Sequence, residues 1–533
     1  MRVSTRAPSG DCKDVTSASC PVTRHNGHVT DRRPPWALAG VLAGLAGLAT
    51  SYAAAMVLTI RESPVVAVAE MVIRLTPGEA AERAISVLGH FDKPALVIGI
   101  LLILLALFAL AGRLAEKGFW QPMVVWFALA GLGLGAVLAQ RSAGLADSLP
   151  VLIGLVTWVT AHSALNDALR RERRRPDLES RERRVFVMVA GAISLAAVGI
   201  AAGGRVVGAG RRHVEASRRL LRIPGVTRRQ APVATSVDLA GIAPWQTPNE
   251  DFYLIDTTLA KPTIEPQDWA LRIHGLVDRE LVLTYSDLVE RELTESWITL
   301  NCVSNEVGGG LVGNARWSGV RLADLLADLG VSDQADAVLQ TSHDGWFCAT
   351  PLAALTDDRD AMLAVAMNGR PLPIEHGFPV RTIVPGLYGY VSATKWVVDM
   401  EVTTFETAVG YWTTKGWSAE GPVKIASRID VPRSGDDVEV GDVQIGGVAW
   451  HQHTGIEAVE VQVDGREWER AELGEVPSVD TWVQWKVTVD VPEGDHTVRV
   501  RAIGKDGATQ TDVVRAPDPD GSTGLHAIEI SAS

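Results

Sequence analysis

The stretch on which the fold of the soluble half depends is Trp297-Ile-Thr-Leu-Asn-Cys302-Val-Ser-Asn-Glu-Val-Gly-Gly-Gly310. Its apolar, β-branched first part predicts a strand, and the strand ends at a cysteine that is followed by a run of glycines. A thiolate at a strand end is a good soft ligand for a metal ion, and glycines let a ligand approach the backbone closely. A lone cysteine after an apolar run is more often a buried core residue. The context of Cys302 in the rest of the chain must therefore decide between a ligand and a core residue.

The other cysteines form no pattern of their own. They are Cys12, Cys20 and Cys348, without a Cys-x-x-Cys pair or a Cys-x-x-Cys-His haem attachment. A disulfide framework, a zinc ribbon and an iron–sulfur cluster are therefore not expected. Cys348, in Gly345-Trp-Phe-Cys-Ala-Thr350, is interpreted as a core residue.

Charge divides the 533-residue chain into two unlike parts. Residues 1–212 carry a net charge of +9 and the remainder −22, which together give the −13 of the whole chain. A basic first part is typical of a membrane region, and the acidic remainder of a soluble body. We expect no nucleic-acid partner.

Five apolar segments predict a transmembrane region over residues 36–208. Each is long enough to cross a bilayer, which takes roughly 17 to 25 residues per helix. Their charged residues stand almost wholly between the segments, as hydrocarbon requires, and this argues against the alternative of buried helices in a large soluble core. The segments are residues 36–60, 94–112, 120–140, 148–165 and 185–207.

The distribution of arginine predicts the orientation of this region in the cell membrane. The tail, residues 1–35, carries six lysines and arginines, and the connection between the fourth and fifth segments holds Arg170-Arg-Glu-Arg-Arg-Arg175 and Arg181-Glu-Arg-Arg184. Basic connections remain on the cytoplasmic side, so the N-terminus is expected there. After five crossings the acidic body emerges on the opposite, extracytoplasmic face.

The run Glu182-Arg183-Arg184-Val185-Phe186-Val187-Met188 resembles a twin-arginine export signal, although the same residues equally suit ordinary positive-inside charge. A signal at this internal position would export the last helix and the soluble body by a separate route. Replacing Arg183 and Arg184 by lysine tests it.

Two further features of the membrane region concern ligands and surfaces. His162 lies within a span and His90 just before the second, which is not the axial pair that a b-type haem needs, so no haem is predicted. The connection 61–93 has mixed charges and apolar spacing near 3.6, which indicates an amphipathic helix on the outer surface.

The soluble half is predicted to contain a linker and two domains. Residues 209–241 are basic and contain Pro and Ala, which indicates a solvated or membrane-surface linker. Residues 242–423 show short β-branched runs between Gly, Pro and Asp, with helical stretches at 285–291 and 320–329. This pattern is typical of an α+β domain with mostly antiparallel sheets.

Residues 424–533 are predicted to form an all-β, immunoglobulin-like sandwich. Alternating strands at about ten-residue spacing are separated by turns such as Asp464-Gly465 and Glu493-Gly494. By itself such a sandwich suggests a docking or dimerising module. The predicted strands are residues 438–443, 447–451, 458–463, 482–491, 496–502 and 509–515.

An ordered set of motifs surrounds Cys302 and extends over about 280 residues. The set comprises Asn249-Glu-Asp-Phe-Tyr253, Trp269-Ala-Leu-Arg-Ile-His-Gly275, Leu300-Asn-Cys302, Gly313-Asn-Ala-Arg-Trp-Ser-Gly319, Met367-Asn-Gly-Arg-Pro-Leu-Pro373 and His376-Gly-Phe-Pro-Val-Arg381. In order and spacing it resembles the sulfite-oxidase-like molybdopterin family. Gly446-Gly-Val-Ala-Trp450, Gly455-Ile456, Val463-Asp-Gly465 and Arg501-Ala502 resemble that family's C-terminal dimerisation domain, which implies a homodimer.

The resemblance implies a molybdenum–molybdopterin cofactor and roles for individual residues. Cys302 matches the thiolate that ligates molybdenum. The residues that match cofactor contacts are Asn249, Phe252, Tyr253, Thr341, His376, Arg381, Ala393, Thr394 and Lys395. Arg381, between Pro379 and Pro385, suits a phosphate, because a rigid loop can hold a guanidinium in place. For each residue taken alone, ordinary surface or turn chemistry is the simpler interpretation.

Arg316, in Gly313-Asn-Ala-Arg-Trp317, matches an arginine of the substrate pocket and is expected to act beside the metal. A structural ion pair is the alternative. Two cations of the sulfite pocket have no counterpart: Leu254-Ile-Asp-Thr-Thr258 lacks the arginine of true sulfite oxidases, and Val303-Ser-Asn-Glu306 replaces x-Gly-Asn-Arg-Arg. Sulfite, a small dianion, is therefore not the expected substrate. Tyr388 and Tyr411 are candidates for the active-site tyrosine.

The resemblance implies oxygen-atom transfer at an extracytoplasmic molybdenum site, with two electrons exchanged with a separate partner. The alternatives are a reductase of sulfoxides or other S- and N-oxides with the same fold, and a non-catalytic, membrane-tethered binding module. Metal and pterin analysis separates the two enzyme hypotheses from the third.

Overall fold

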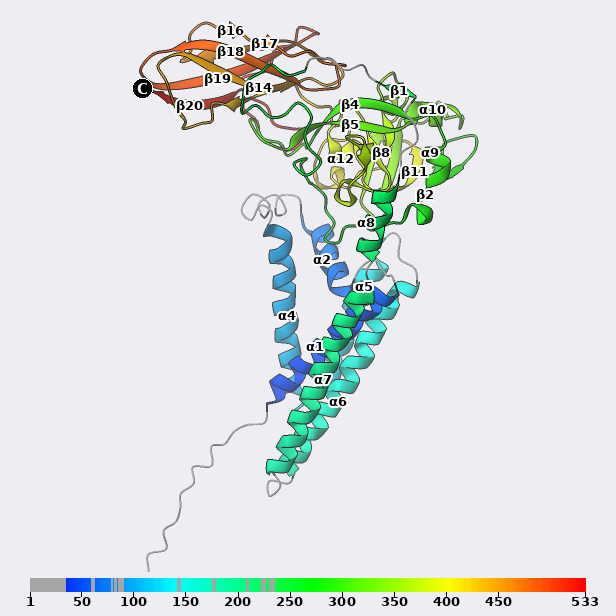
Figure 1. Ribbon diagram of the computed structural model, residues 1–533. Coiled ribbons are helices and arrows are strands. Elements are labelled where there is room, and N and C mark those ends of the chain that lie inside the picture. Colours follow the sequence, from blue (N-terminus) through cyan, green and yellow to red (C-terminus); the bar gives the residue numbers. More distant parts are fainter. Residues whose placement is uncertain are drawn as a thin grey trace, which may run out of the picture.

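The computed structural model describes residues 35–58, 63–77, 80, 84, 91–140, 145–174, 179–207, 210–221, 227–229 and 235–533. A helical bundle comes first, then a domain of two sheets, then a β-sandwich that leads to the C-terminus (Figure 1). This order confirms the predicted fold class. The tail that was predicted to be cytoplasmic, residues 1–34 with Cys12 and Cys20, lies outside the described residues, as does His90.

Four helices in the described part of the chain are long and apolar enough to cross a membrane. The apolar part of the fifth predicted span is shorter and covers Phe186–Ile200. Four crossings are therefore supported by length and composition, and the count of five stays a prediction. The bundle helices are α1 (Trp36–Val57), α4 (Asp92–Leu114), α5 (Trp120–Leu138), α6 (Leu149–Arg174) and α7 (Glu179–Val207).

Small residues let α1 pack closely against its neighbours. A Cβ on Gly40 would lie 2.1 Å from the carbonyl oxygen of Phe108 in α4, so a larger side chain would push the two helices apart. Trp158 of α6 donates to the carbonyl oxygen of Gly44 at 2.9 Å. Its ring stacks on that of Trp126 at 5.5 Å, and the ring of His162 meets Trp126 edge-on. His162 thus packs in the bundle core, and the predicted absence of haem stays a prediction.

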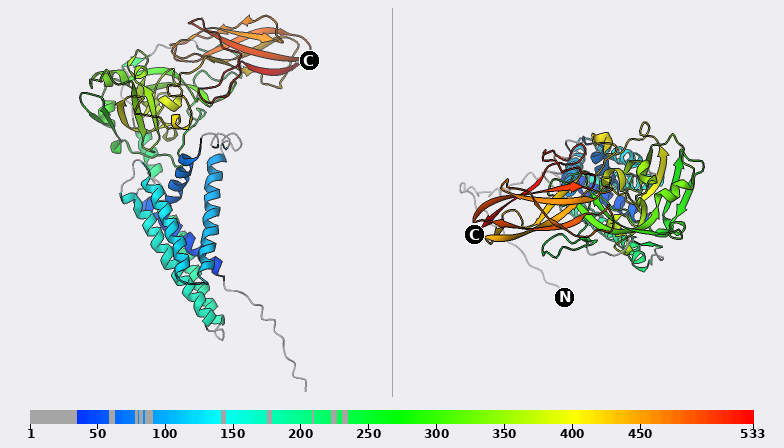
Figure 2. Two further views of the ribbon diagram at one scale, coloured as in Figure 1. Left: turned by 180° about the vertical axis from the view of Figure 1, so that it is seen from behind. Right: turned by 90° about the horizontal axis from the view of Figure 1, so that it is seen from above.

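One end of the helical bundle faces the soluble domains, and the other end lies away from them (Figure 1). The first residues of α1 and the ends of α6 and α7 that adjoin the arginine-rich connection lie away from the soluble domains in both side views (Figures 1 and 2). The helix ends that adjoin these two basic regions in the sequence therefore lie toward the same end of the bundle. This arrangement is compatible with the predicted orientation, which stays a prediction.

Two short helices connect the bundle to the soluble domains. α2 (Pro64–Leu75) lies in the connection that was predicted to be amphipathic. α8 (Gly210–Leu220) lies in the predicted linker. Val214 of α8 is buried in a cluster with Phe252, and Arg218 donates to the carbonyl oxygen of Pro371 at 3.1 Å. This part of the linker is therefore packed against the domain that follows it rather than solvated, because one apolar residue faces that domain's core.

The domain after the linker, which we call the catalytic domain for the activity that its resemblance implies, contains two mostly antiparallel sheets, as predicted. The first has the order β1-β4-β5-β8-β10 with β9 beside β8, and the second β3-β2-β11-β6-β7. Parallel pairing occurs between β1 and β4 and between β11 and β2. The strands are β1 (Arg228–Arg229), β2 (Ala270–Gly275), β3 (Leu281–Thr284), β4 (Thr294–Asn301), β5 (Val312–Arg321), β6 (Ala337–Ser342), β7 (Phe347–Pro351), β8 (Met362–Met367), β9 (Arg370–Pro371), β10 (Arg381–Ile383) and β11 (Val397–Thr403).

Short helices cover the ends of these strands. The predicted stretches at 285–291 and 320–329 correspond to α9 (Tyr285–Val289) and α10 (Leu322–Ala327). Thr284 and Asp287 form a capping box at the start of α9, which explains why that helix begins there. The others are α11 (Ala353–Thr356) and α12 (Gly389–Ser392).

The C-terminal domain consists of two sheets, β12-β14-β18-β17 and β13-β20-β19-β15-β16, whose apolar faces share one core. The predicted strands at 438–443 and 447–451 are largely one strand. The prediction of a strand at 509–515 is wrong: this segment has only isolated bridges at Thr509 and Arg515, and residues 526–532 form the strand that pairs with residues 494–500 instead. The strands are β12 (Ala426–Val431), β13 (Asp437–Val438), β14 (Gly441–Trp450), β15 (Ile456–Val463), β16 (Glu469–Arg470), β17 (Glu472–Leu473), β18 (Val483–Val491), β19 (Gly494–Gly504) and β20 (His526–Ala532).

Candidate functional site

Cys302 is the first residue after β4 and begins a tight loop. Its N–H donates to the carbonyl oxygen of Leu311 at 2.9 Å, and its own carbonyl accepts from Asn305 N at 3.1 Å. The side-chain oxygen of Asn305 accepts from Leu311 N at 2.7 Å and so closes the loop from inside. The glycines that follow Cys302 thus belong to a loop with a defined shape, as a metal-holding loop requires.

The thiol of Cys302 is almost fully buried. Burial raises its pKa, while hydrogen bonds from Ser304 and the positive charge of Lys395 act in the opposite direction. A thiolate here is therefore unfavourable without a compensating positive charge. A soft metal cation would supply that charge.

Arg381, the first residue of β10, is a buried cation with spare hydrogen-bonding capacity. It donates to the carbonyl oxygens of His376 at 3.2 Å and Ala393 at 3.4 Å, and its guanidinium lies 5.2 Å from the ring centre of Trp317. Its Nε is buried without a partner. Burial lowers the pKa of Arg381 to about 10. An anion in the site would satisfy both the charge and the orphaned N–H.

Lys395 is the second buried cation. Its Nζ lies 3.0 Å from Oδ2 of Asp256, and burial lowers its pKa to about 8 although Asp256 opposes this shift. The same carboxylate pairs with Lys93 at 3.2 Å and with Lys261. Burial alone would raise the pKa of Asp256, but the three lysine charges outweigh it and lower the pKa. The surroundings of Lys395 are thus positive overall.

An aromatic wall completes this side of the site. Phe252 stacks on Tyr253 with 5.2 Å between ring centres and meets His376 edge-on at 5.7 Å. Nε2 of His376 bonds the carbonyl oxygen of Asn249 at 3.0 Å. Burial, together with the charges of Lys395 and Arg381, lowers the pKa of His376 to about 3, so its ring is neutral at physiological pH. Tyr253 also remains neutral, because burial and the nearby Cys302 raise its pKa.

Two glycines bring the loop 389–396 close to these groups. A Cβ on Gly389 would lie 3.9 Å from the hydroxyl of Tyr253, 3.7 Å from the carbonyl oxygen of Asn301 and 3.6 Å from Cβ of Ala393. Gly377 has φ +106°, and a Cβ there would be 3.0 Å from Cβ of Arg381 and 3.1 Å from Cα of Lys395. The residue before Cys302, the aromatic wall and the loop therefore surround one small space.

Nine of the eleven predicted residues lie in or beside this cluster. They are Cys302, Asn249, Phe252, Tyr253, His376, Arg381, Ala393, Thr394 and Lys395. Thr394 is fully buried, with its hydroxyl 3.3 Å from Sγ of Cys348, which supports the interpretation of Cys348 as a core residue.

Thr341 does not face the cluster. It pairs with Asp399 and Phe347, and side chains alternate along a strand, so it lies on the opposite face of its sheet from Gln340. Gln340 is the residue of β6 that reaches this region, since it accepts from the hydroxyl of Thr382 at 2.6 Å.

Arg316 also points away. Trp317, its neighbour in β5, packs against Phe252 and Arg381, so Arg316 lies on the other face. There it approaches Glu295 at 3.6 Å and the ring of Trp297 at 5.6 Å. The structure favours the structural ion pair over a pocket role.

A small pocket lies between the catalytic domain and the C-terminal sandwich, at the loop that follows Cys302. Asn301 and Asn305, which flank Cys302 in the chain, line it together with Tyr388. Among its lining residues only Glu306 and Lys424 are charged, and Lys424 is paired with Asp520 at 2.9 Å. This pocket thus contains no free cation among the described side chains.

The C-terminal sandwich holds the loop that contains Cys302. Ser522 donates to the carbonyl oxygen of Asn305 at 2.6 Å, and Arg428 to that of Gly309 at 2.9 Å. Gln452 donates to the carbonyl oxygen of Thr299 at 3.2 Å. This role was not expected from the sequence, which indicated only a docking or dimerising module. No local signal marks these polar residues, because their partners lie more than 100 positions away.

A second group of possible metal ligands lies apart from Cys302 and carries no assignment. Asp357, Asp358 and His453 bring three ligand atoms within reach of one another. Arg359 already pairs with Asp357 at 2.8 Å, and Asp480 approaches His453 at 3.5 Å.

The residues around Cys302 fit a molybdopterin cofactor. A buried thiol suits the metal, and a buried guanidinium with an unpartnered N–H and a buried ammonium suit an anionic pterin phosphate. The sequence motifs indicated these groups but gave no role to Asp256. That residue was noted only as part of residues 254–258, a segment that lacks an arginine.

Comparison with known proteins identifies relatives over this part of the chain. A family model described as the oxidoreductase molybdopterin binding domain matches residues 258–412. Human mitochondrial sulfite oxidase is 29% identical over 301 residues, 48% of this chain and 55% of that protein. The uncharacterized oxidoreductase YuiH of Bacillus subtilis is 35% identical over 153 residues, 29% of this chain and 74% of that protein.

A solved structure, the sulfane dehydrogenase SoxCD from Paracoccus pantotrophus, aligns with a TM-score of 0.46 and 23% identity, over 59% of this chain and 88% of that one. The chain spans about half the length of the sulfite oxidases it matches.

Proposed function

This chain belongs to the sulfite-oxidase-like molybdopterin oxidoreductase family, and from that membership we propose that it is a membrane-anchored enzyme. Its reaction is oxygen-atom transfer at an extracytoplasmic molybdenum site, with two electrons exchanged with a separate partner. The four membrane-length helices support the anchor, and the helix ends that adjoin the two basic regions, at the far end of the bundle, support the orientation.

The observation that carries this proposal is a buried thiol, Cys302, in the same cluster as the buried guanidinium of Arg381, whose Nε has no partner. Both groups are costly to bury unless a ligand compensates them. Molybdopterin would do so at both ends, because its metal takes the thiolate and its phosphate takes the cations. When bound, the cofactor supplies a metal that accepts or donates an oxygen atom with two electrons.

The protein's own groups would bind, orient and exclude water. Arg381 and Lys395 hold the anionic end, and Phe252 and Tyr253 form an apolar wall that limits solvent. His376, kept neutral by burial and by the charges of Lys395 and Arg381, which lower its pKa, holds its ring on the carbonyl oxygen of Asn249 and adds no further positive charge. The loop from Cys302 to Leu311 fixes the thiol relative to this wall.

The pocket at the loop that follows Cys302 supports a substrate other than sulfite, if the substrate reaches the metal through it. A small dianion would need unpaired cations there, but Lys424 is tied to Asp520 and the other charge is that of Glu306. A neutral substrate, such as a sulfide or its S-oxide, suits this lining better. The same observation favours the second candidate function, reduction of sulfoxides or other S- and N-oxides, in which the oxygen moves in the opposite direction.

Tyr388 is the better of the two candidates for an active-site tyrosine. It lines the pocket at the loop that follows Cys302, and burial and the nearby thiol hold its pKa raised, at about 12. Its hydroxyl is therefore a neutral donor. Tyr411 instead lines a separate pocket that adjoins α2.

The partners follow from the same chemistry. A bilayer, a small-molecule substrate and a separate electron-transfer protein or carrier are required, and a homodimer through the C-terminal sandwich is proposed from the family resemblance.

Metal analysis of the detergent-purified full chain tests this function. About one molybdenum and one pterin per chain are expected after expression in a cofactor-competent host. Cys302→Ser should keep the fold and lose turnover with sulfides or S-oxides and artificial electron carriers. A wild-type chain without molybdenum and pterin would refute the proposal.

A further inference from the structure

Asp256 is the point at which the helical bundle meets the candidate site. Its carboxylate is 8% exposed and pairs with Lys395 of the loop 389–396 and with Lys93 of α4. The window of α4 that begins at Lys93 is one of the four that are apolar enough to cross a membrane. One carboxylate therefore connects a candidate membrane helix to a residue of the proposed cofactor site.

Lys93 holds the backbone as well as the carboxylate. Its Nζ donates to the carbonyl oxygens of Asp256 at 2.7 Å and Thr258 at 2.9 Å, and to Oδ1 of Asp256 at 3.2 Å. The three donors of an ammonium group are thus all directed to one short segment. A carboxylate whose backbone is held in this way presents its second oxygen to Lys395 from a fixed place.

A second contact fastens the same junction but does not involve the carboxylate. Lys415 of the catalytic domain donates to the carbonyl oxygens of Arg74 at 3.3 Å and Thr76 at 2.8 Å, at the end of α2. Lys415 therefore offers a matched comparison for Lys93. Both are lysines that join the two regions, and of the two only Lys93 pairs with Asp256.

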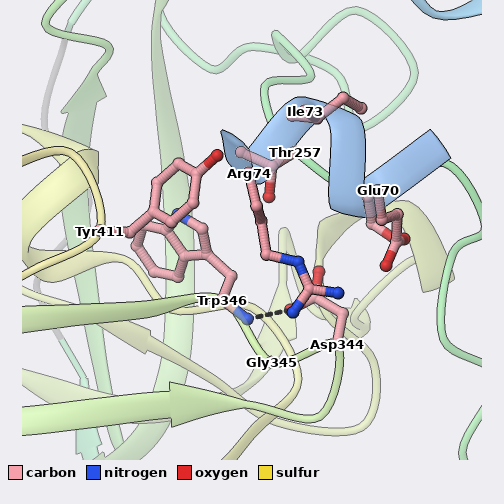
Figure 3. Close-up of a pocket in the computed structure, with 9 residues that line it drawn as sticks. Glu70, Ile73, Arg74, Thr257, Asp344, Gly345, Trp346 and Tyr411 are labelled. Atoms are coloured by element: carbon pink, nitrogen blue, oxygen red, sulfur yellow. Dashed lines mark hydrogen bonds between the residues drawn. The ribbon is translucent and has the colours of Figure 1, made fainter. Parts of the chain in front are cut away.

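At this junction, α2 forms one wall of a pocket whose other wall belongs to the catalytic domain. This small pocket is lined by Glu70, Ile73 and Arg74 from α2 and by Thr257, Trp346 and Tyr411 from the catalytic domain. Figure 3 shows the side chain of Arg74 extended from α2 toward Asp344 and Trp346. Without the bundle, the segment that contains Asp256 would lose this wall and the three bonds from Lys93.

We propose that Asp256 is a positioning residue for Lys395, and that Lys93 of the bundle positions Asp256, so that the membrane region completes the cofactor site. The inference rests on the proposed function, because Lys395 has a role only where an anionic pterin binds. It assigns the bundle a part in holding the cofactor besides that of an anchor.

The test compares Lys93→Gln, Lys415→Gln and Lys93→Arg in the full chain. The rate of pterin release from the purified protein is followed by pterin fluorescence, independently of turnover. Loss of charged hydrogen bonds of this kind predicts release roughly tenfold to hundredfold faster for Lys93→Gln. Lys415→Gln should stay within about twofold of the wild type on the same scale, and Lys93→Arg should restore most of the retention.

A second measurement does not require the cofactor. Hydrogen exchange of residues 389–396 is compared in chains made without molybdopterin, and Lys93→Gln should accelerate exchange there while Lys415→Gln should not. Equal exchange in all variants would overturn the inference, as would equal pterin release. If both lysine variants release pterin equally fast, any loosening of the junction suffices and the specific role of Asp256 is refuted. A wild-type chain that never binds pterin would refute the proposed function. The exchange comparison would still test whether Lys93, through Asp256, restrains residues 389–396.

Discussion

Gln452 of the C-terminal sandwich donates to the carbonyl oxygen of Thr299, three residues before Cys302, at 3.2 Å. The same amide nitrogen also contacts the side-chain oxygen of Asn301, the residue next to Cys302. With Ser522 and Arg428, it makes the sandwich a support for the loop that holds the thiol. The C-terminal domain therefore contributes to the site by fixing the backbone on both sides of Cys302.

Gln452→Ala is expected to destabilise the chain by about 1 to 3 kcal/mol, because it leaves buried acceptors without a donor. The thermal unfolding midpoint of the detergent-purified chain should fall by a few degrees. Gln462→Ala is the control, since Gln462 makes one exposed bond, to the carbonyl oxygen of Arg466. Equal midpoints for the two variants would contradict the supporting role of Gln452.

Arg381→Gln is expected to lower cofactor content, because the guanidinium is the buried cation with an unpartnered N–H in the site. The charged hydrogen bonds lost correspond to roughly tenfold weaker retention or more. Pterin and molybdenum per chain are the measurements. Arg279→Gln, on the surface of the same domain, serves as control, and full occupancy in Arg381→Gln would remove this arginine from the proposed site.

Arg316→Gln is expected to leave kcat/KM within about twofold, a change of less than about 0.5 kcal/mol. The physical reason is that Arg316 lies on the face of β5 opposite to Trp317 and Arg381, beside Glu295. Steady-state kinetics with a sulfide or S-oxide is the measurement. A loss of tenfold or more would restore Arg316 to the substrate pocket, as its motif first implied.

The ion pair between His496 and Asp464, with 2.6 Å between Nδ1 and Oδ2, predicts a pH dependence in the sandwich. The hydrogen bond with Asp464 raises the pKa of His496, so the stabilisation is full below the unfolded pKa of about 6.5 and is lost as the pH rises through the folded value. The effect should be at most about 1 kcal/mol for a pair near the surface. His496→Gln should lower the unfolding midpoint at pH 5.5 and much less at pH 8.5. A loss of equal size at both pH values would refute the charge-based origin.

Much of the fold follows from local sequence. The apolar segments correspond within a few residues to α1, α4 and α5 and to the first part of α6, because the length of a membrane helix and its freedom from charge are properties of one continuous stretch. Alternation predicted most strands of the sandwich in the same way. It failed at 509–515, where the alternating pattern is present but the place beside β19 is taken by β20, a competition that no local pattern reveals.

The ordered motifs around Cys302 determined, from the sequence alone, the family, the buried thiol and most of the residues that gather beside it. Tertiary structure decided which faces those residues occupy. Arg316 and Trp317 are neighbours in sequence, yet only Trp317 faces the site, because side chains alternate along a strand and the packing of the two sheets selects the face. Tertiary structure also brought distant residues into contact: Asp256 with Lys395, and Gln452 with the strand end before Cys302. In each of these pairs the two residues are more than a hundred positions apart in the sequence. Only folding brings them into contact, so motif spacing along the chain cannot predict the pairs.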